Sequence, residues 1–73
     1  MLNETIAATA ERLAELAARA YDADFDSPEY EELDAEYERQ FNTAVKAIAF
    51  TYNELEEFVA FKLNVAVDDV FAG

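Results

Sequence analysis

The chain lacks the side chains on which most enzyme and metal chemistry depends, because its 73 residues include no cysteine and no histidine. Without cysteine it can form neither a disulfide bond nor a zinc–thiolate site. Histidine and cysteine are also the commonest catalytic bases, nucleophiles and metal ligands. Ser27 is the only serine, and Gly73 is the only glycine, which excludes a glycine-rich phosphate loop. We therefore expect a protein that is not an enzyme and that has no cofactor and no metal site.

Basic residues are also scarce, since 5 Lys and Arg stand against 17 Asp and Glu and the formal net charge is −12. Such a chain repels nucleic acid phosphates and anionic membranes, so the expected partner is a basic surface of another protein. The longest uncharged run after the N-terminus, residues 47–53, is far too short to cross a bilayer. The opening Met-Leu-Asn-Glu lacks the positive charge of a signal peptide, which favours a cytoplasmic location.

The apolar residues are arranged for a single all-α domain over residues 1–73. Between Ser27 and Leu63 they repeat every eleven residues, close to the helical period, in three rows: Tyr30, Phe41, Tyr52 and Leu63; Leu33, Ala44 and Leu55; Tyr37, Ile48 and Val59. This spacing predicts one long helix or two nearly collinear helices. The expected fold is a small helical bundle: a hairpin of helices 3–21 and 28–51, a third helix from about 53 to 63, and a short C-terminal helical turn. The residues expected in the core are Leu33, Ile48, Leu55 and Val59.

The segment 22–28 predicts a capped turn between the first two helices. Ser27 can cap the second helix with Pro28 at its first position, or Asp26 can cap it with Glu29 closing a capping box. The alternating acids from Asp22 also resemble the start of a calcium loop. The rest of that motif is absent, because Ser27 stands where glycine is needed. A second boundary is expected near 51–53, as a kink or short break with a continuous helix as the alternative. Asn53 with Glu56, or Thr51 with Glu54, could cap a new helix there. Asn64 is expected to end the third helix.

The densest charge lies between Asp22 and Glu38, which holds nine acids and no base in seventeen residues. From Glu29 to Glu38 the helix carries about one carboxylate per 2.5 Å of its axis, against about one charge per 1.7 Å for duplex DNA. Like charges at helical spacing each destabilise the helix by about 0.2–0.5 kcal/mol. A solvated face that keeps the protein soluble, or the acidic surface of a high-salt proteome, explains the run as well as a binding surface does. The candidate partner-binding residues are Asp24, Asp26, Glu29, Glu31, Glu32, Asp34, Glu36, Glu38, Tyr30 and Tyr37.

The C-terminal part, "NELEEFVAFKLNVAVDDVFAG" from Asn53 to Gly73, resembles the helix–turn–helix ending of phage-repressor-type DNA-binding domains in its hydrophobic spacing. The resemblance implies that these residues pack with a geometry similar to that of the repressor-type domains. It does not imply DNA binding, because basic residues to meet phosphate are nearly absent. In size and charge, though not in motif, the chain is similar to the DNA-mimic anti-restriction and anti-CRISPR proteins of phages.

These observations predict a non-enzymatic, acidic protein-binding module. Its sharpest form is an inhibitor that occupies a basic nucleic-acid-binding surface of a partner protein. The alternatives are a structural, dimerising helical bundle from an acidic proteome, and a diverged helix–turn–helix regulator that acts through protein partners. A homodimer is expected because Phe50 and Phe61, eleven residues apart and outside the three apolar rows, can form a second apolar face.

Overall fold

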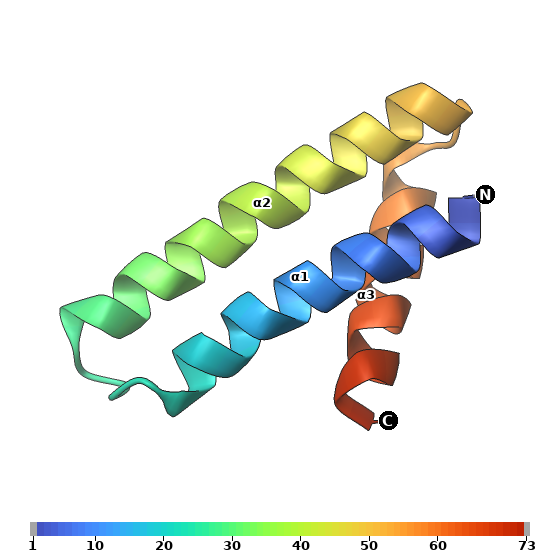
Figure 1. The fold of residues 1–73 in the computed structure, drawn as a ribbon. Coiled ribbons are helices and arrows are strands. Elements are labelled where there is room, and N and C mark those ends of the chain that lie inside the picture. Colours follow the sequence, from blue (N-terminus) through green and yellow to red (C-terminus); the bar gives the residue numbers. More distant parts are fainter. Residues whose placement is uncertain (1, 73) are drawn as a thin grey trace.

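The computed structural model of the protein describes residues 2–72, and the side chains of residues 4–72. It contains three helices, α1 (Leu2–Asp22), α2 (Pro28–Tyr52) and α3 (Glu56–Ala72), and no strand in the part described (Figure 1). The prediction of an all-α fold built from a helical hairpin and a third helix is confirmed. The first predicted helix is one residue shorter than α1 at each end, and the second is one residue shorter than α2 at its C-terminal end.

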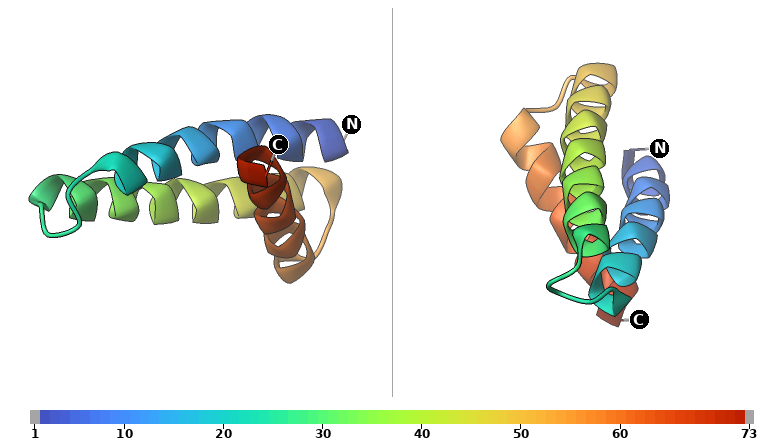
Figure 2. Two further views of the ribbon diagram at one scale, coloured as in Figure 1. Left: turned by 90° about the horizontal axis from the view of Figure 1, so that it is seen from below. Right: turned by 90° about the vertical axis from the view of Figure 1, so that its left-hand side faces the viewer.

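The helices form two layers. α1 and α2 run antiparallel as a hairpin, and α3 crosses one face of it at a large angle (Figures 1 and 2). The principal extents are 39 × 24 × 15 Å. Because 25 helical residues span about 37 Å, α2 alone accounts for the long dimension. In Figure 1 α3 passes behind α1, so the hairpin face toward the viewer is not covered by α3.

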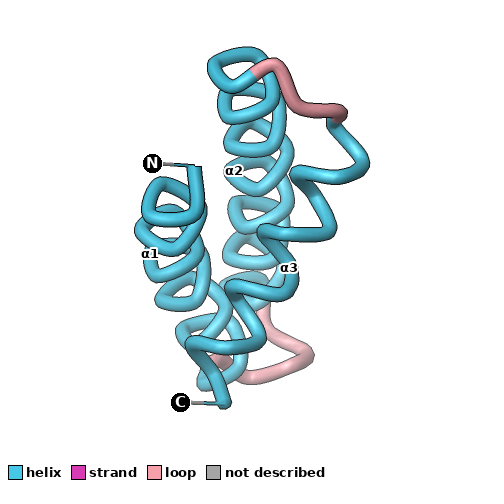
Figure 3. The backbone as a smooth tube through the Cα atoms, turned by 90° about the vertical axis from the view of Figure 1, so that its right-hand side faces the viewer, coloured by secondary structure: helices cyan, strands magenta, loops and turns pink. Residues whose placement is uncertain are grey.

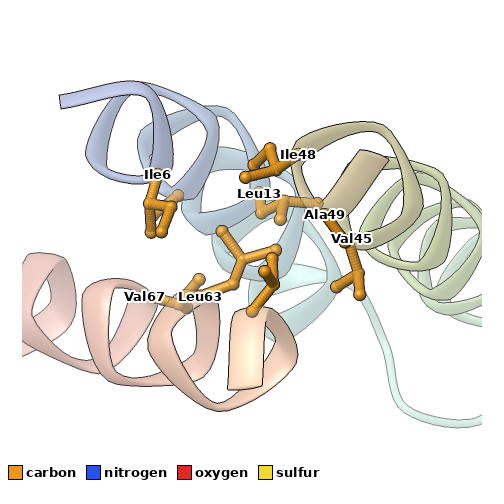
Figure 4. Packing of buried hydrophobic residues seen from close by; sticks show 9 residues of the cluster. Ile6, Leu13, Val45, Ile48, Ala49, Leu63 and Val67 are labelled. Atoms are coloured by element: carbon orange, nitrogen blue, oxygen red, sulfur yellow. The ribbon is translucent and has the colours of Figure 1, made fainter. Parts of the chain in front are cut away.

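A small core joins all three helices at the end of the hairpin that α3 crosses. α1 contributes Ile6, Ala10 and Leu13, and α2 contributes Val45, Ile48 and Ala49. The α3 members, Val59, Leu63 and Val67, are four residues apart and therefore share one face of the helix. Figure 4 shows these side chains directed toward one another from the three ribbons. The predicted burial of Ile48 and Val59 is confirmed.

The turn between α1 and α2 is closed by Ser27, as one of the two sequence alternatives predicts. Ser27 has extended backbone angles and Pro28 occupies the first helical turn. The Ser27 hydroxyl accepts a hydrogen bond from the Tyr30 N–H at 3.2 Å and donates one to the Asp24 carbonyl at 2.6 Å. The hydroxyl thereby satisfies one of the otherwise unpaired N–H groups at the helix start. The Phe25 and Tyr30 rings pack across this cap with centroids 5.0 Å apart.

The expected break near 51–53 is confirmed, since α2 ends at Tyr52 and α3 begins at Glu56. The nearly collinear arrangement of the two helices is wrong, because the chain turns sharply at Asn53. Asn53 is in the left-handed region with φ 57° and ψ 35°, and its N–H donates to the Ala49 carbonyl. The Glu54 N–H donates to the same carbonyl at 3.0 Å, so the two bonds close the end of α2. Asparagine tolerates this conformation better than most residues. Asn53 therefore ends α2, where the sequence suggested it as the cap of the next helix, and α3 leaves at an angle (Figure 3).

The expected end of the third helix at Asn64 is also wrong, since α3 continues to Ala72 and no separate terminal turn follows within residues 2–72. Asn64 lies exposed inside the helix, where its polar side chain meets water. The burial of Val67 one turn beyond Leu63 extends the helix through a β-branched stretch, because tertiary packing outweighs weak helix propensity. Residues 56–72 are one helix, so the helix–turn–helix resemblance does not describe this structure.

Leu55 is the clearest error in the predicted core. It is 79% exposed, and Leu33 is only half-buried. The eleven-residue rows hold within α2 and lose their phase at Asn53, where the chain changes direction. Leu55 precedes the first turn of α3, and its carbonyl accepts the Val59 N–H at 3.0 Å. Its side chain therefore lies outside the helix face that carries the core.

Two matched leucine truncations test this assignment of the core. Leu63→Ala removes a fully buried side chain and should lower the free energy of unfolding by about 2–5 kcal/mol. Leu55→Ala removes the same atoms from an exposed position and should change it by no more than about 0.5 kcal/mol. Urea unfolding followed by circular dichroism measures both. Equal losses in the two variants would show that the helix-to-core assignment of residues 53–67 is wrong.

The Ser27 cap gives a second prediction. Ser27→Ala should lower the free energy of unfolding by about 1 kcal/mol, whereas Ser27→Asp should keep the cap and lose only a few tenths. Thr51→Ala is the control, because the Thr51 hydroxyl donates to the Ala47 carbonyl from an exposed position inside α2 and caps nothing. If Ser27→Ala unfolds at the same urea concentration as Thr51→Ala, the cap does not stabilise the turn.

Candidate protein-binding surface: the acidic tip

The end of the hairpin away from α3 carries the acidic run, and we call it the acidic tip. It comprises the end of α1, the loop and the first part of α2, with the acids Asp22, Asp24, Asp26, Glu29, Glu31, Glu32, Asp34, Glu36 and Glu38. In Figure 1 this end of the hairpin extends well to one side of α3. The buried residues of α2 begin only at Val45. The acidic tip is therefore a two-helix extension of the three-helix core.

The helical period divides the α2 acids of the tip into two rows. Glu29, Glu32 and Glu36 follow one side of the helix, and the other row is Glu31, Asp34 and Glu38. Between the two rows lies an apolar side made by the half-buried residues Tyr30, Leu33 and Tyr37. The high charge density was predicted from the sequence, but as a single acidic face. The structure places the carboxylates on two sides of α2.

Nearly all of these carboxylates are open to solvent. Of the nine acids, eight are exposed and Glu36 is half-buried. Glu36 forms an ion pair with Arg39 and accepts a hydrogen bond from Gln40 at 3.3 Å. The hydrogen bond from Arg39, followed by that from Gln40, holds the pKa of the Glu36 carboxyl below its usual value. Within residues 2–72 the other tip acids have no cation within ion-pair distance, so their charge is available to a partner.

The two tyrosines predicted as partner-binding residues have mainly structural surroundings. Tyr37 packs against the core and stacks on Phe41 with ring centroids 6.1 Å apart. Tyr30 packs on Phe25 at the cap. Asp24 and Asp26 are exposed in the loop, and the Asp24 carbonyl, not its carboxylate, is the atom that serves the turn. The structure thus brings the predicted acids together in one region, with both tyrosine rings partly covered by other side chains.

A groove without acidic residues lies between α1 and α2, on the hairpin face away from α3. Its volume is about 610 Å³, and every residue lining it comes from α1 or α2. Its lining contains no acid. It has an apolar floor that includes Leu13 and Ile48, and polar walls that include Arg12 and Arg39. At one end Thr5 Oγ1 and Tyr52 Oη share a hydrogen bond of 3.2 Å across the two helices.

The groove is not predictable from the sequence, because its walls come from two separate segments of the chain, residues 5–13 and 39–52. The only signal in the sequence is the spacing of threonines by four on α1, at Thr5 and Thr9, with Thr43 and Thr51 on α2. That spacing places small side chains on one side of each helix. It does not show that the two sides meet.

Two other kinds of site receive no support from residues 2–72. No group of three or more acidic side chains in that range lies close enough to hold a metal ion. None of the three described helices combines the length and the hydropathy that a membrane span requires. Comparison of the chain with protein-family models, with curated proteins and with solved structures finds no match.

Tyr37 offers a pH test of how α2 packs against α3. Burial, and secondarily the nearby Asp68 carboxylate, raise the pKa of the Tyr37 hydroxyl above its ordinary value of 10.0. The unfolded chain therefore releases this proton at a lower pH than the native protein does. The resulting stability is present below pH 10 and is lost as the pH rises through the native pKa.

In Tyr37→Phe the decline of the free energy of unfolding above pH 10 should be shallower than in the parent. Tyr21→Phe, at an 88% exposed position, should leave that decline unchanged. Urea unfolding at a series of alkaline pH values gives both slopes. A slope in Tyr37→Phe as steep as in Tyr21→Phe would exclude the burial of Tyr37 against α3.

Proposed function

We propose that the protein is a non-enzymatic binding module whose acidic tip occupies a basic surface of another protein. The single observation that supports this most is the projection of nine acids, eight of them exposed, on a hairpin end that contributes little to the core. Like-charge neighbours such as Glu32 and Glu36 destabilise the helix without stabilising the fold. A binding role explains why this cost is concentrated at one end of the molecule.

The shape of the tip fits a groove better than a flat surface. The molecule is only 15 Å thick along its shortest axis, and the two rows of carboxylates lie on two sides of α2. A helix charged on two sides can contact both walls of a groove. The charge spacing along the axis, about one per 2.5 Å, is of the same order as that of duplex DNA. The most specific form of the proposal is therefore an inhibitor that fills a nucleic-acid-binding groove, in the manner of the DNA-mimic proteins of phages.

Two alternative functions are less well supported. A diverged helix–turn–helix regulator lacks its motif, because residues 56–72 form one helix. A structural module from an acidic proteome predicts acids spread over the whole surface. Here nine of the 17 acids lie within residues 22–38. Dimerisation is compatible with the inhibitor and is considered separately below.

The test compares two triple variants with the same change in charge. Glu31, Glu32 and Glu38 in the acidic tip are changed to Gln in one variant, and the exposed acids Glu11, Glu15 and Glu56 are changed to Gln in the control. Each immobilised protein captures its partner from a lysate of the source cells, with and without duplex DNA as competitor. The tip variant should lose the captured protein, the control should retain it, and duplex DNA should release it from the control.

Stability should move in the opposite direction to binding. Removing the repulsion at Glu31–Asp34, Glu32–Glu36 and Asp34–Glu38 should leave the tip variant as stable as the parent or more stable by about 0.2–0.5 kcal/mol per pair. Binding by the parent should weaken steeply with added salt. If the tip variant and the control bind equally at low salt, the acidic tip is not the binding surface.

A further inference from the structure

The outer side of α3 is an apolar surface that the fold leaves uncovered. Phe58, Phe61 and Val65 follow one another at spacings of three and four, on the side of α3 away from Val59 and Leu63. We call these three residues the outer stripe. All three are exposed, Phe61 by 66%. α3 is thus apolar on two opposite sides, and a helix that is apolar all round is ordinarily buried.

The accessible surface of the chain is larger than that of a compact protein of the same mass, which leaves surface for a second molecule to cover. The described chain exposes 5335 Å², whereas a compact monomer of its mass exposes about 4,500 Å². The difference is close to the roughly 800 Å² that each partner contributes to a standard interface. The thin, elongated form of the molecule creates this excess, and a second molecule laid on α3 would reduce it.

From these observations we propose that the outer stripe is a homodimer interface, in which α3 packs antiparallel against α3 of a second copy about a twofold axis near Phe61. The stripe is self-complementary in this arrangement, because Phe58 then faces Val65 of the second copy and Phe61 faces its own equivalent. Such an isologous contact closes after two copies. The spacing of three and four is also the one that lets two helices interlock along a seam.

A head-to-tail contact between the outer stripe and the α1–α2 groove is the main competing arrangement of the same chain. The groove is lined only by α1 and α2 residues and lies on the hairpin face opposite α3. A stripe-to-groove contact joins two different surfaces on opposite faces, so it generates rings or open assemblies of more than two copies. The twofold contact uses the same apolar residues and leaves both acidic tips free at the far end of each hairpin.

The charges around the stripe fix the sign of the salt dependence. Glu57 and Asp68 lie beside the stripe on one flank of α3, and the antiparallel pairing brings Glu57 near Asp68 of the second copy. Lys62 and Asp69 lie on the other flank, and the Lys62 Nζ is 4.7 Å from the centroid of the Phe58 ring. Each chain also carries a net charge of −12. Added salt screens both repulsions, so the dimer should tighten as salt rises. This is the reverse of the behaviour expected for a basic partner at the acidic tip, and the two proposals can therefore fail separately.

The experiment is sedimentation equilibrium of the full chain over a range of protein and salt concentrations. The parent should show a monomer–dimer equilibrium at micromolar concentration that shifts toward dimer with salt. Phe61→Glu should weaken the dimer by about 30-fold or more, as expected for a central aromatic residue. Phe50→Glu is the matched control, because Phe50 is 91% exposed on α2, outside the stripe, and should leave the equilibrium unchanged.

Circular dichroism of both variants shows whether the helices remain folded. A second readout needs no variant, since the melting temperature of a dimer rises with protein concentration. A parent that sediments as an 8.2 kDa monomer throughout, with a melting temperature independent of concentration, would overturn the proposal. So would an equal loss of the dimer in Phe50→Glu and Phe61→Glu, or assemblies that grow beyond two copies.

Discussion

The packing of Val59, Leu63 and Val67 against the hairpin is the interaction on which the rest of the structure depends. α1 and α2 can pair along their length, but their interface contains few large apolar side chains, because much of α1 is alanine. The three α3 residues complete the only cluster of buried residues that joins all three helices in the described part of the chain. They can reach it only because Asn53 ends α2 in a left-handed conformation and sends the chain back across the hairpin.

This dependence divides the molecule into two parts. The end crossed by α3 holds the core, and the far end holds most of the charge. A core of this size leaves a small domain with a modest margin of stability, so strong repulsion within the core region would be costly. Charge that is concentrated where α2 leaves the core costs only local helix stability. The architecture therefore permits a highly charged surface without placing it against the packed residues.

The sequence is sufficient to predict the helices, the turn between the first two helices and the position of the acidic region. Ser27 and Pro28 are strong local signals, and the apolar rows within α2 report its inner side correctly. The prediction failed where tertiary packing decided the outcome. Nothing local distinguishes Asn53 as the end of α2 from Asn53 as the cap of the next helix, and this ambiguity misplaced Leu55. The weak helix formers after Asn64 predict a turn, because the burial of Val67 is not visible in the sequence.

The candidate site shows the same limit. The sequence shows that the acids of the tip lie in one segment. Their division into two rows can be recognised only once the buried side of α2 is known. Two other features can be predicted only when the packing of the helices is known. They are the groove between Arg12 and Arg39 and the exposed outer side of α3. Phe50 and Phe61 are both exposed as expected, yet they lie on different helices, so their eleven-residue spacing does not place them on one helical face.

Hydrogen–deuterium exchange of the protein, free and bound to the partner that it captures, tests the central claim most directly. The free protein should exchange slowly at the buried cluster of α1, α2 and α3, and faster in the loop and the first turns of α2. Binding should slow exchange within residues 22–38 and leave α3 unchanged. Protection by the partner on α3 or along the α1–α2 groove, with none in residues 22–38, would contradict the assignment of binding to the acidic tip.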